Sequence, residues 1–104
     1  MPRYTEVIKK FVVPFQMRHF RQDVPANSMV VHVGQDANEP GCFGVWYKYT
    51  TMLWDDDTME MPTKTWLFGV VRTGEEFVAG SVHVGTIAQH DAEWHLLDLA
   101  PVRG

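Results

Sequence analysis

Cysteine is almost absent from this sequence, since Cys42 is the only one among 104 residues. A single thiol cannot close an intramolecular disulfide, which is typical of proteins from a reducing compartment. Long apolar runs are absent too, and none approaches the roughly 20 residues of a membrane-spanning helix. The first four residues lead into charged sequence rather than into the apolar segment of a signal peptide. We therefore expect a cytoplasmic protein that is stabilised by hydrophobic burial.

The motifs of common catalytic and cofactor sites are also missing. The glycines fall at turns and within strands, and they form neither a phosphate-binding loop nor a nucleophile elbow. Cys42 follows Pro40 and Gly41 at the start of a predicted strand, without an adjacent base or a helix N-terminus to activate its thiol. The sequence therefore predicts a protein without catalytic residues and without a cofactor, rather than an enzyme.

Positive charge is scarce and unevenly placed. Residues 1–22 contain five basic residues and one acidic residue, whereas the whole chain has a net charge of −4. Proteins that bind nucleic acid usually cluster an excess of Lys and Arg, so we expect a protein partner instead. The asymmetry is explained either by opposite charges paired across neighbouring strands or by a bipolar surface that steers a charged partner.

The sequence does contain a regular alternation of apolar with polar or small residues. The tetrapeptide Val-His-Val-Gly occurs at residues 31–34 and again at 82–85, and a period of two is typical of half-buried strands. With 104 residues, 45% of them hydrophobic, the chain has material for a single domain, residues 1–104. We predict an all-β fold, a small antiparallel meander of about six strands curled into a barrel or a sandwich.

The predicted strands are bounded by turn residues such as Pro, Gly, Asn and Asp. After Pro14, either residues 15–21 extend or restart the first strand, or residues 15–22 form a short helix. The six strands are expected at residues 4–13, 29–35, 42–54, 65–72, 77–87 and 93–99.

Some of these strands carry apolar residues on both faces. Along residues 65–72, Phe68 and Val70 share one face, while Leu67 and Val71 share the other. A sheet of this size cannot bury two faces alone. Either the sheet closes into a barrel whose interior the aromatic residues line, or a second copy covers one face. The second alternative predicts a symmetric homodimer.

Three histidines occupy alternating positions of predicted strands, and Arg72 ends another strand. If these strands are neighbours, His32, His83 and His95 project from one face and, with Arg72, suit a small anionic ligand or a nucleotide. Zinc is another ligand for converging imidazoles, but these three lack the short spacing and the carboxylate or thiolate companions of usual zinc sites. We therefore predict no metal site and take the four residues as candidate ligand-binding residues.

Acidic and aromatic residues supply candidates for a protein-binding surface. The acidic cluster after residue 54 lacks the alternating oxygen ligands and the glycine of a calcium loop, so we expect a solvated turn. Exposed carboxylates there suit a basic groove on a partner, and tryptophans either fill the core or contact a ligand. The candidate partner-binding residues are Asp55, Asp56, Asp57, Glu60, Trp46, Trp54 and Trp66.

Short motifs along the chain resemble small uncharacterised all-β proteins encoded by tailed bacteriophages. These motifs are residues 24–25 (VP), 29–35 (MVVHVGQ), 68–74 (FGVVRTG), 83–86 (HVGT) and 94–97 (WHLL), with Trp46 between them. The stretch of residues 48–64 is longer than in those proteins, so the resemblance does not extend to the acidic cluster. The resemblance implies a cytoplasmic, phage-encoded accessory protein, and it carries no established activity.

Our leading hypothesis is a non-enzymatic binding protein that binds or inhibits a host or defence protein through the acidic turn and exposed aromatic residues. The alternative is a binder of a small anionic ligand or nucleotide, in a pocket lined by aromatic and His side chains. A closed core with a protruding acidic turn favours the first hypothesis, and an open basic pocket favours the second.

Overall fold

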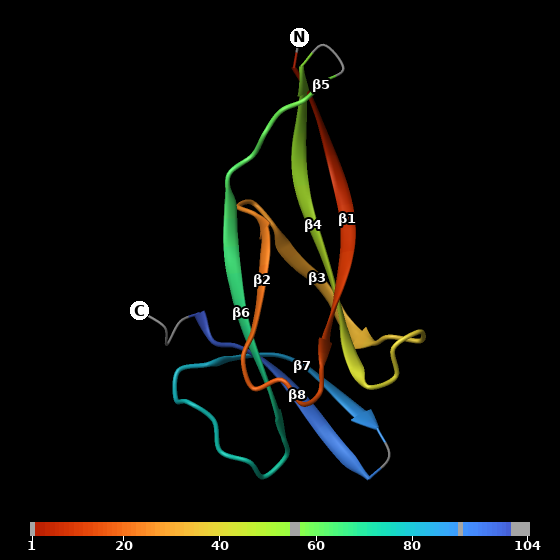
Figure 1. Cartoon of the computed structure of the whole chain (residues 1–104), viewed down its shortest axis with the longest axis vertical. Helices are drawn as coiled ribbons and strands as arrows, with labels where there is room; N and C mark the ends of the chain where they lie inside the picture. The colour runs from red at the N-terminus through yellow and green to blue at the C-terminus, as the bar shows by residue number, and fades with distance from the viewer. Residues whose placement is uncertain (1, 55–56, 90, 101–104) are drawn as a thin grey trace.

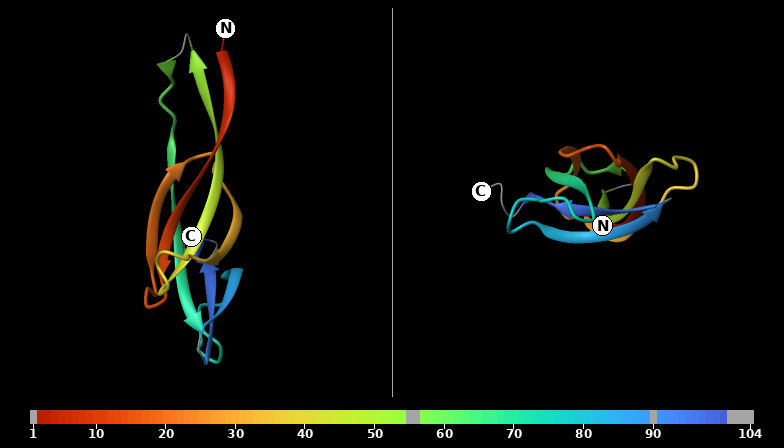
Figure 2. Two further views of the ribbon diagram at one scale, coloured as in Figure 1. Left: turned by 90° about the vertical axis from the view of Figure 1, so that its right-hand side faces the viewer. Right: turned by 90° about the horizontal axis from the view of Figure 1, so that it is seen from below.

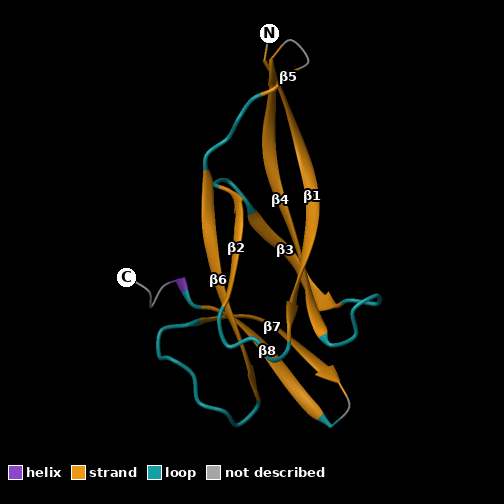
Figure 3. Cartoon of the chain, viewed as in Figure 1, coloured by secondary structure: helices purple, strands orange, loops and turns teal. Residues whose placement is uncertain are grey.

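The structure is a computed structural model that describes residues 2–54, 57–89 and 91–100. The eight elements in this part of the chain are β-strands, and Figure 3 also shows a short helical stretch at Ala100. The described residues include no helix long and apolar enough to cross a membrane. The strands are β1 (Pro2–Pro14), β2 (Phe20–Pro25), β3 (Met29–Gln35), β4 (Cys42–Trp54), β5 (Asp57–Thr58), β6 (Thr63–Arg72), β7 (Val82–Gln89) and β8 (Ala92–Asp98).

The strands form two antiparallel sheets that pack as a sandwich, as Figures 1 and 2 show. The order in the first sheet is β1-β4-β3, and the short β5 also pairs with β4. The order in the second sheet is β2-β6-β8-β7. The predicted all-β antiparallel class and its sandwich form are therefore confirmed, whereas the sheets are not closed into a barrel.

The paired strands lie farther apart in the sequence than in the predicted meander, where consecutive strands pair. β1 pairs with β4 along its whole length, so that Pro14 lies opposite Cys42, although β2 and β3 intervene in the sequence. After Pro14, which has no N–H to continue the ladder, residues 15–19 carry the chain to the second sheet. There β2 pairs with β6 from Phe20 onwards. Of the alternatives for this segment, a restarted strand is correct.

The strand limits agree with the prediction where turn residues bound a strand on both sides. β3 and β4 begin and end at the predicted residues. By contrast, β7 begins at Val82 and not at residue 77. Gly74 and Gly80 have φ angles of 95° and 94°, which glycine adopts without steric cost. These two turns hold residues 73–81 outside the sheet as a loop.

The core lies between the two sheets and explains why β6 has two apolar faces. On its inner face, Phe68 and Val70 belong to the main core, whose other buried members are Val13, Phe15, Phe43, Val45, Ile87 and Leu96. On its outer face, Val71 forms a second cluster with Leu97 and Leu99, and Leu67 packs against it. The predicted division of the β6 side chains between two faces is therefore confirmed.

One end of the first sheet projects beyond the sandwich as a two-stranded ribbon (Figures 1 and 2). The pairing of β3 with β4 stops at Met29, which lies opposite Lys48, and Lys48 in turn lies opposite Ile8 of β1. Beyond this level β1 and β4 continue as a pair to Pro2 and Trp54. The molecule is correspondingly elongated, with extents of 53 × 34 × 16 Å.

Candidate functional site

The outer face of the projecting ribbon carries large apolar side chains. The antiparallel register places Tyr4 opposite Met52, while Trp54 and Ile8 lie on the same face of the ribbon because side chains alternate between faces. Tyr4 is 66% exposed, Ile8 64% and Trp54 48%. Soluble proteins seldom expose neighbouring aromatic and aliphatic residues without an interaction that covers them.

In the ribbon, the edge of β4 that faces away from β1 also forms hydrogen bonds, which keep the ribbon in a defined shape. The side-chain amide of Asn27 accepts from the backbone N–H of Thr50 and donates to its carbonyl oxygen, both at 3.0 Å. Asn27 precedes the start of β3 and thereby replaces the next residue of a strand paired with β4. Farther along, the N–H of Met59 donates to the carbonyl oxygen of Met52 at 2.9 Å, and β5 pairs with the end of β4.

The acidic residues lie at the end of this ribbon. Asp57 is exposed and pairs with Trp54 across the β4–β5 turn, and Glu60 is exposed nearby in sequence. Asp55 and Asp56 lie outside the described residues. We call the group at this end the ribbon tip, and it consists of the half-buried Met52 and the exposed residues Tyr4, Trp54, Asp57, Met59 and Glu60.

The other two tryptophans predicted to bind a partner lie elsewhere. Trp66 packs in the interior against the rings of Phe11, Tyr47 and Phe68, at centroid distances between 5.6 and 6.1 Å. Trp46 packs against Gly44, where an added Cβ would come within 2.7 Å of the indole ring. Trp66 is therefore a core residue, and Trp46 does not reach the ribbon tip.

Beside Trp46, an ion pair between Lys10 and Asp36 links β1 to the loop after β3. The ammonium of Lys10 lies 5.6 Å from the centre of the Trp46 ring and donates a hydrogen bond to Asp36. The carboxylate of Asp36 also accepts from the N–H groups of Asn38 and Glu39, at 2.8 and 3.1 Å. The hydrogen bond from Lys10, and then that from Asn38, lower the pKa of Asp36 below its ordinary value, although burial opposes this shift.

The structure brings together two of the three predicted histidines. His83 of β7 and His95 of β8 lie on the outer face of the second sheet, with Nε2 of His83 at 3.2 Å from Nδ1 of His95. A bulge between His83 and Gly85 shifts the register and places Thr86 opposite His95. His32 lies on the first sheet, with its ring tilted by 51° against that of Trp46 at a centroid distance of 5.0 Å.

Hydrogen bonds join these histidines to two threonines and a carboxylate, and one assignment of protons satisfies all of them. Thr73 donates to Glu93 at 3.2 Å, so its oxygen accepts from Nε2–H of His95 at 2.7 Å. Nδ1 of His95 then accepts from the hydroxyl of Thr86 at 3.0 Å, and that oxygen accepts from Nε2–H of His83 at 2.8 Å. In this arrangement Nε2 of each imidazole donates, Nδ1 of His95 accepts, and Nδ1 of His83 takes no part in these bonds.

A cavity of about 300 Å³ lies beside this chain of hydrogen bonds. Three of the four predicted ligand-binding residues line it, namely Arg72, His83 and His95. The guanidinium of Arg72, however, lies 5.4 Å from the centre of the Trp94 ring. Arg72 pairs with Trp94 across β6 and β8, so its side chain lies on one face of the sheet and that of His95 on the other. In the described part of the chain, no group of three His, Cys, Asp or Glu side chains could hold a metal ion.

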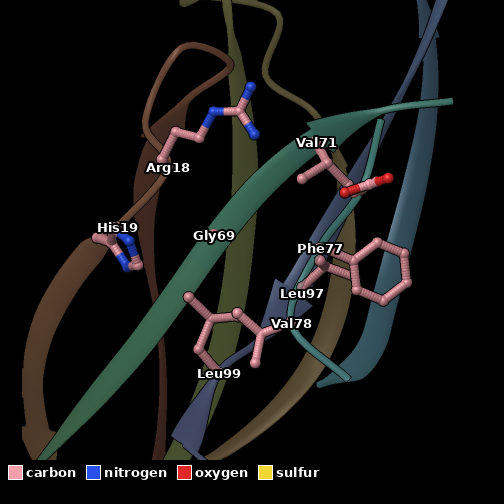
Figure 4. A pocket seen from close by; sticks show the side chains of 9 residues that line it. Arg18, His19, Gly69, Val71, Phe77, Val78, Leu97 and Leu99 are labelled. Atoms are coloured by element: carbon pink, nitrogen blue, oxygen red, sulfur yellow. The ribbon is translucent and has the colours of Figure 1, made fainter. Parts of the chain in front are cut away.

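A second cavity of about 130 Å³ adjoins the first, because Val71, Phe77 and Leu97 line both. Figure 4 shows Phe77 and Val78 of the loop beside Leu97 of β8 and Leu99, which follows that strand. Gly69 forms part of the floor, and the turn before β2 crosses it closely. The two cavities form one apolar groove between the loop of residues 73–81 and the outer face of the second sheet.

Comparison with protein families assigns the chain to a family. The model of the domain of unknown function DUF7352 matches residues 4–103. The chain belongs to this family. Neither the curated proteins nor the solved structures contain a significant match to it. The matched region of this DUF7352 domain includes both the projecting ribbon and the groove on the second sheet.

The thiol of Cys42 is not activated in this DUF7352 domain. Burial raises the pKa of Cys42, and the nearby carboxylates of Glu39 and Asp36 raise it further. A raised pKa keeps the thiol protonated at neutral pH, whereas a nucleophile needs the thiolate.

Several residues of the two sites were not predicted from the sequence. Tyr4 and Met52 become neighbours only through the long-range register of β1 and β4, which no local pattern reveals. Phe77 was assigned to a strand, although the glycines on either side, Gly74 and Gly80, were an available signal for an excluded loop.

Proposed function

We propose that this protein is a non-enzymatic binding module that contacts another protein through the ribbon tip. The observation that supports this proposal most directly is that the ribbon leaves the sandwich and exposes Tyr4 and Trp54 beside Asp57. These side chains lie outside the core, so their exposure has no evident role in folding. Aromatic anchors of this kind contribute a large share of the binding energy in many protein interfaces.

The charge of the ribbon tip indicates what kind of protein would fit. Asp57 and Glu60 are exposed carboxylates next to the apolar anchors. A basic rim around an apolar depression would complement them, and the charges would mainly speed association. On the strength of the phage resemblance, we propose a cytoplasmic accessory protein that inhibits a host or defence protein, and the family match neither supports nor opposes that part of the proposal.

Affinity capture with paired variants tests the proposal. Immobilised wild-type protein, Trp54→Ser and Phe77→Ser are exposed to the same bacterial extract, and retained proteins are quantified by mass spectrometry. Phe77 is the matched control because it is 55% exposed and lies on the loop away from the ribbon. We expect a protein that wild type and Phe77→Ser retain and that Trp54→Ser loses. Equal retention by all three, or retention by none, would contradict the proposal.

A second candidate function is the binding of a small ligand in the groove of the second sheet. The observation that favours it is that His83, His95 and Arg72 line one cavity with an apolar floor of Val71 and Leu97. A ligand with an apolar body and a hydrogen-bond donor would lie on this floor and donate to Nδ1 of His83. The position of the Arg72 guanidinium over Trp94 gives less support to an anionic ligand than to a neutral one.

Titrations followed by NMR distinguish these ligand types. Indole serves as the neutral aromatic probe and adenosine monophosphate as the anionic probe, and both are added to wild type and to His83→Gln. Binding in the groove is expected to shift the amide signals of residues 71–77 and 95–97, more weakly in the variant. Shifts that are absent, or that His83→Gln leaves unchanged, would rule out these probes as ligands of the pocket.

A further inference from the structure

We propose that two copies of this protein form a symmetric dimer in which their β1 strands pair antiparallel, with Ile8 on the two-fold axis. β1 is one end strand of the first sheet, so one of its edges faces β4 and the other faces no strand in the described part of the chain. An edge strand whose outer N–H and C=O groups face no second strand, as between Tyr4 and Val12 of β1, is a template for a further strand. The second copy is the occupant that the sequence of β1 itself favours.

The geometry of antiparallel pairing limits the ways in which β1 can pair with itself. Along a strand, alternate residues direct their backbone groups to the same edge, so residues that face each other in a self-pair are both even or both odd in number. A two-fold axis must therefore pass through a residue rather than between two residues. The candidate axis residues in the middle of β1 are Glu6, Val7, Ile8, Lys9 and Lys10.

Charge decides among these registers. An axis at Glu6, Lys9 or Lys10 places that charged residue opposite its own copy, which is destabilising. An axis at Val7 places Glu6 opposite Ile8, so the carboxylate faces an aliphatic side chain. An axis at Ile8 places Glu6 opposite Lys10 of the second copy and does so twice by symmetry. This register alone pairs opposite charges directly across the new ladder.

The remaining neighbours in the Ile8 register are also compatible. Ile8 faces its own copy and Tyr4 faces Val12 of the second copy, so apolar side chains flank each charged pair. Ile8 and Tyr4 are among the most exposed apolar residues of the described chain, and the pairing would cover part of each. Lys10 donates to Asp36 and Glu6 approaches Lys48 at 3.7 Å, but an ammonium has three protons and a carboxylate accepts several bonds.

The dimer is independent of the proposed function, because pairing occurs in the plane of the first sheet. Ile8 lies at the level where the sheet narrows to the ribbon, so each sandwich would lie alongside the ribbon of the other copy. The two ribbon tips would point in opposite directions, and Trp54 and Asp57 of each would stay accessible, while the pairing would cover part of Tyr4. A partner bound at Trp54 and a second copy bound at Ile8 would not compete.

Self-association of paired variants is the first test. Sedimentation velocity across the micromolar range is measured for wild type, Ile8→Lys and Met29→Lys. Met29 is the matched control, because it is 57% exposed and belongs to the same sheet but lies on β3. We expect wild type and Met29→Lys to dimerise and Ile8→Lys to weaken the dimer by roughly tenfold or more, since it places two ammonium groups on the axis. Circular dichroism confirms that each variant is folded.

Cysteine cross-linking tests the register itself. Paired residues on antiparallel strands have Cα atoms about 4.5–5.5 Å apart, which is within the range that a disulfide spans. In a Cys42→Ser background, Ile8→Cys is expected to form a disulfide-linked dimer on mild oxidation, whereas Glu6→Cys and Val7→Cys are not. A wild type that stays monomeric, a dimer that Ile8→Lys leaves intact or that Met29→Lys abolishes, or preferential cross-linking at residue 6 or 7 would each overturn the proposal.

Discussion

At the scale of single residues, glycines mark the places where other groups approach the sheets closely. An added Cβ at Gly69 would lie 2.6 Å from the carbonyl oxygen of Arg18 and 2.9 Å from a methyl carbon of Leu99. The first contact is with backbone, which cannot rotate away as a side chain can. The turn before β2 crosses β6 at this point, and the N–H of Val70 donates to the carbonyl oxygen of Met17 at 3.0 Å.

We expect Gly69→Ala to lower the free energy of unfolding by about 1–3 kcal/mol, the usual cost of an overpacked site. Gly41→Ala is the control, since nothing lies within 4 Å of an added Cβ there. Urea denaturation of both variants measures the difference. Equal stability of the two variants would show that the turn before β2 moves aside without cost.

The carboxylate of Asp36 makes the stability of the fold depend on pH. Because Lys10 and two backbone N–H groups hold the carboxylate charged, its folded-state pKa lies below the ordinary value of 3.8. A carboxyl group with a lowered pKa stabilises the fold above its unfolded-state pKa, and this contribution disappears as the pH falls through the folded-state pKa.

Melting curves of wild type and Asp36→Asn against pH test this linkage. The variant is expected to melt at a lower temperature than wild type at neutral pH, and the gap is expected to narrow as the pH falls below 3.8. Glu76→Gln, an exposed carboxyl on the loop, is the control. A gap that is the same at neutral and acidic pH would mean that the Asp36 charge does not stabilise the fold.

At the scale of elements, the Asn27 side chain forms the hydrogen bonds at the edge of β4 that the backbone of a paired strand would form. Replacing Asn27 with Ala removes two hydrogen bonds to the backbone of Thr50. Each such bond contributes roughly 0.5–1.5 kcal/mol, and less where water competes, as at this exposed residue. We expect Asn27→Ala to cost about 1 kcal/mol and to speed hydrogen exchange at the Thr50 amide. Unchanged exchange at Thr50, compared with Gln22→Ala as control, would contradict this role.

The elements also show how far the sequence determines the fold. β3 and β4 were predictable because their alternation is local and turn residues bound it. The pairing of β1 with β4 was not, since register between distant strands leaves no local pattern. Strand pairing also decides which histidines converge. His83 and His95 lie on the paired strands β7 and β8, while His32 lies on β3 of the other sheet. Alternation assigns a face but not a sheet.

At the scale of the whole molecule, the carboxylates of the ribbon tip are separated from the core that stabilises the fold. The double variant with Asp57→Asn and Glu60→Gln is expected to change the free energy of unfolding by no more than about 0.5 kcal/mol, because both side chains are exposed. Once a partner protein is identified, the double variant is expected to associate with it more slowly than wild type, and the association rate is expected to depend less on salt. Thermal melting and stopped-flow association against salt measure the two effects. A marked loss of stability would show instead that these carboxylates support the fold.

The proposed binding function depends on the ribbon tip, and photo-cross-linking inside cells tests it most directly. A benzophenone amino acid replaces Trp54 in one variant and Phe77 in another, so that the reactive group is exposed on the ribbon or on the loop. The account predicts that irradiation links the residue 54 variant to a second protein of different mass, and that the residue 77 variant gives no such product. A product from residue 77 with none from residue 54 would place the contact on the groove of the second sheet and contradict the account.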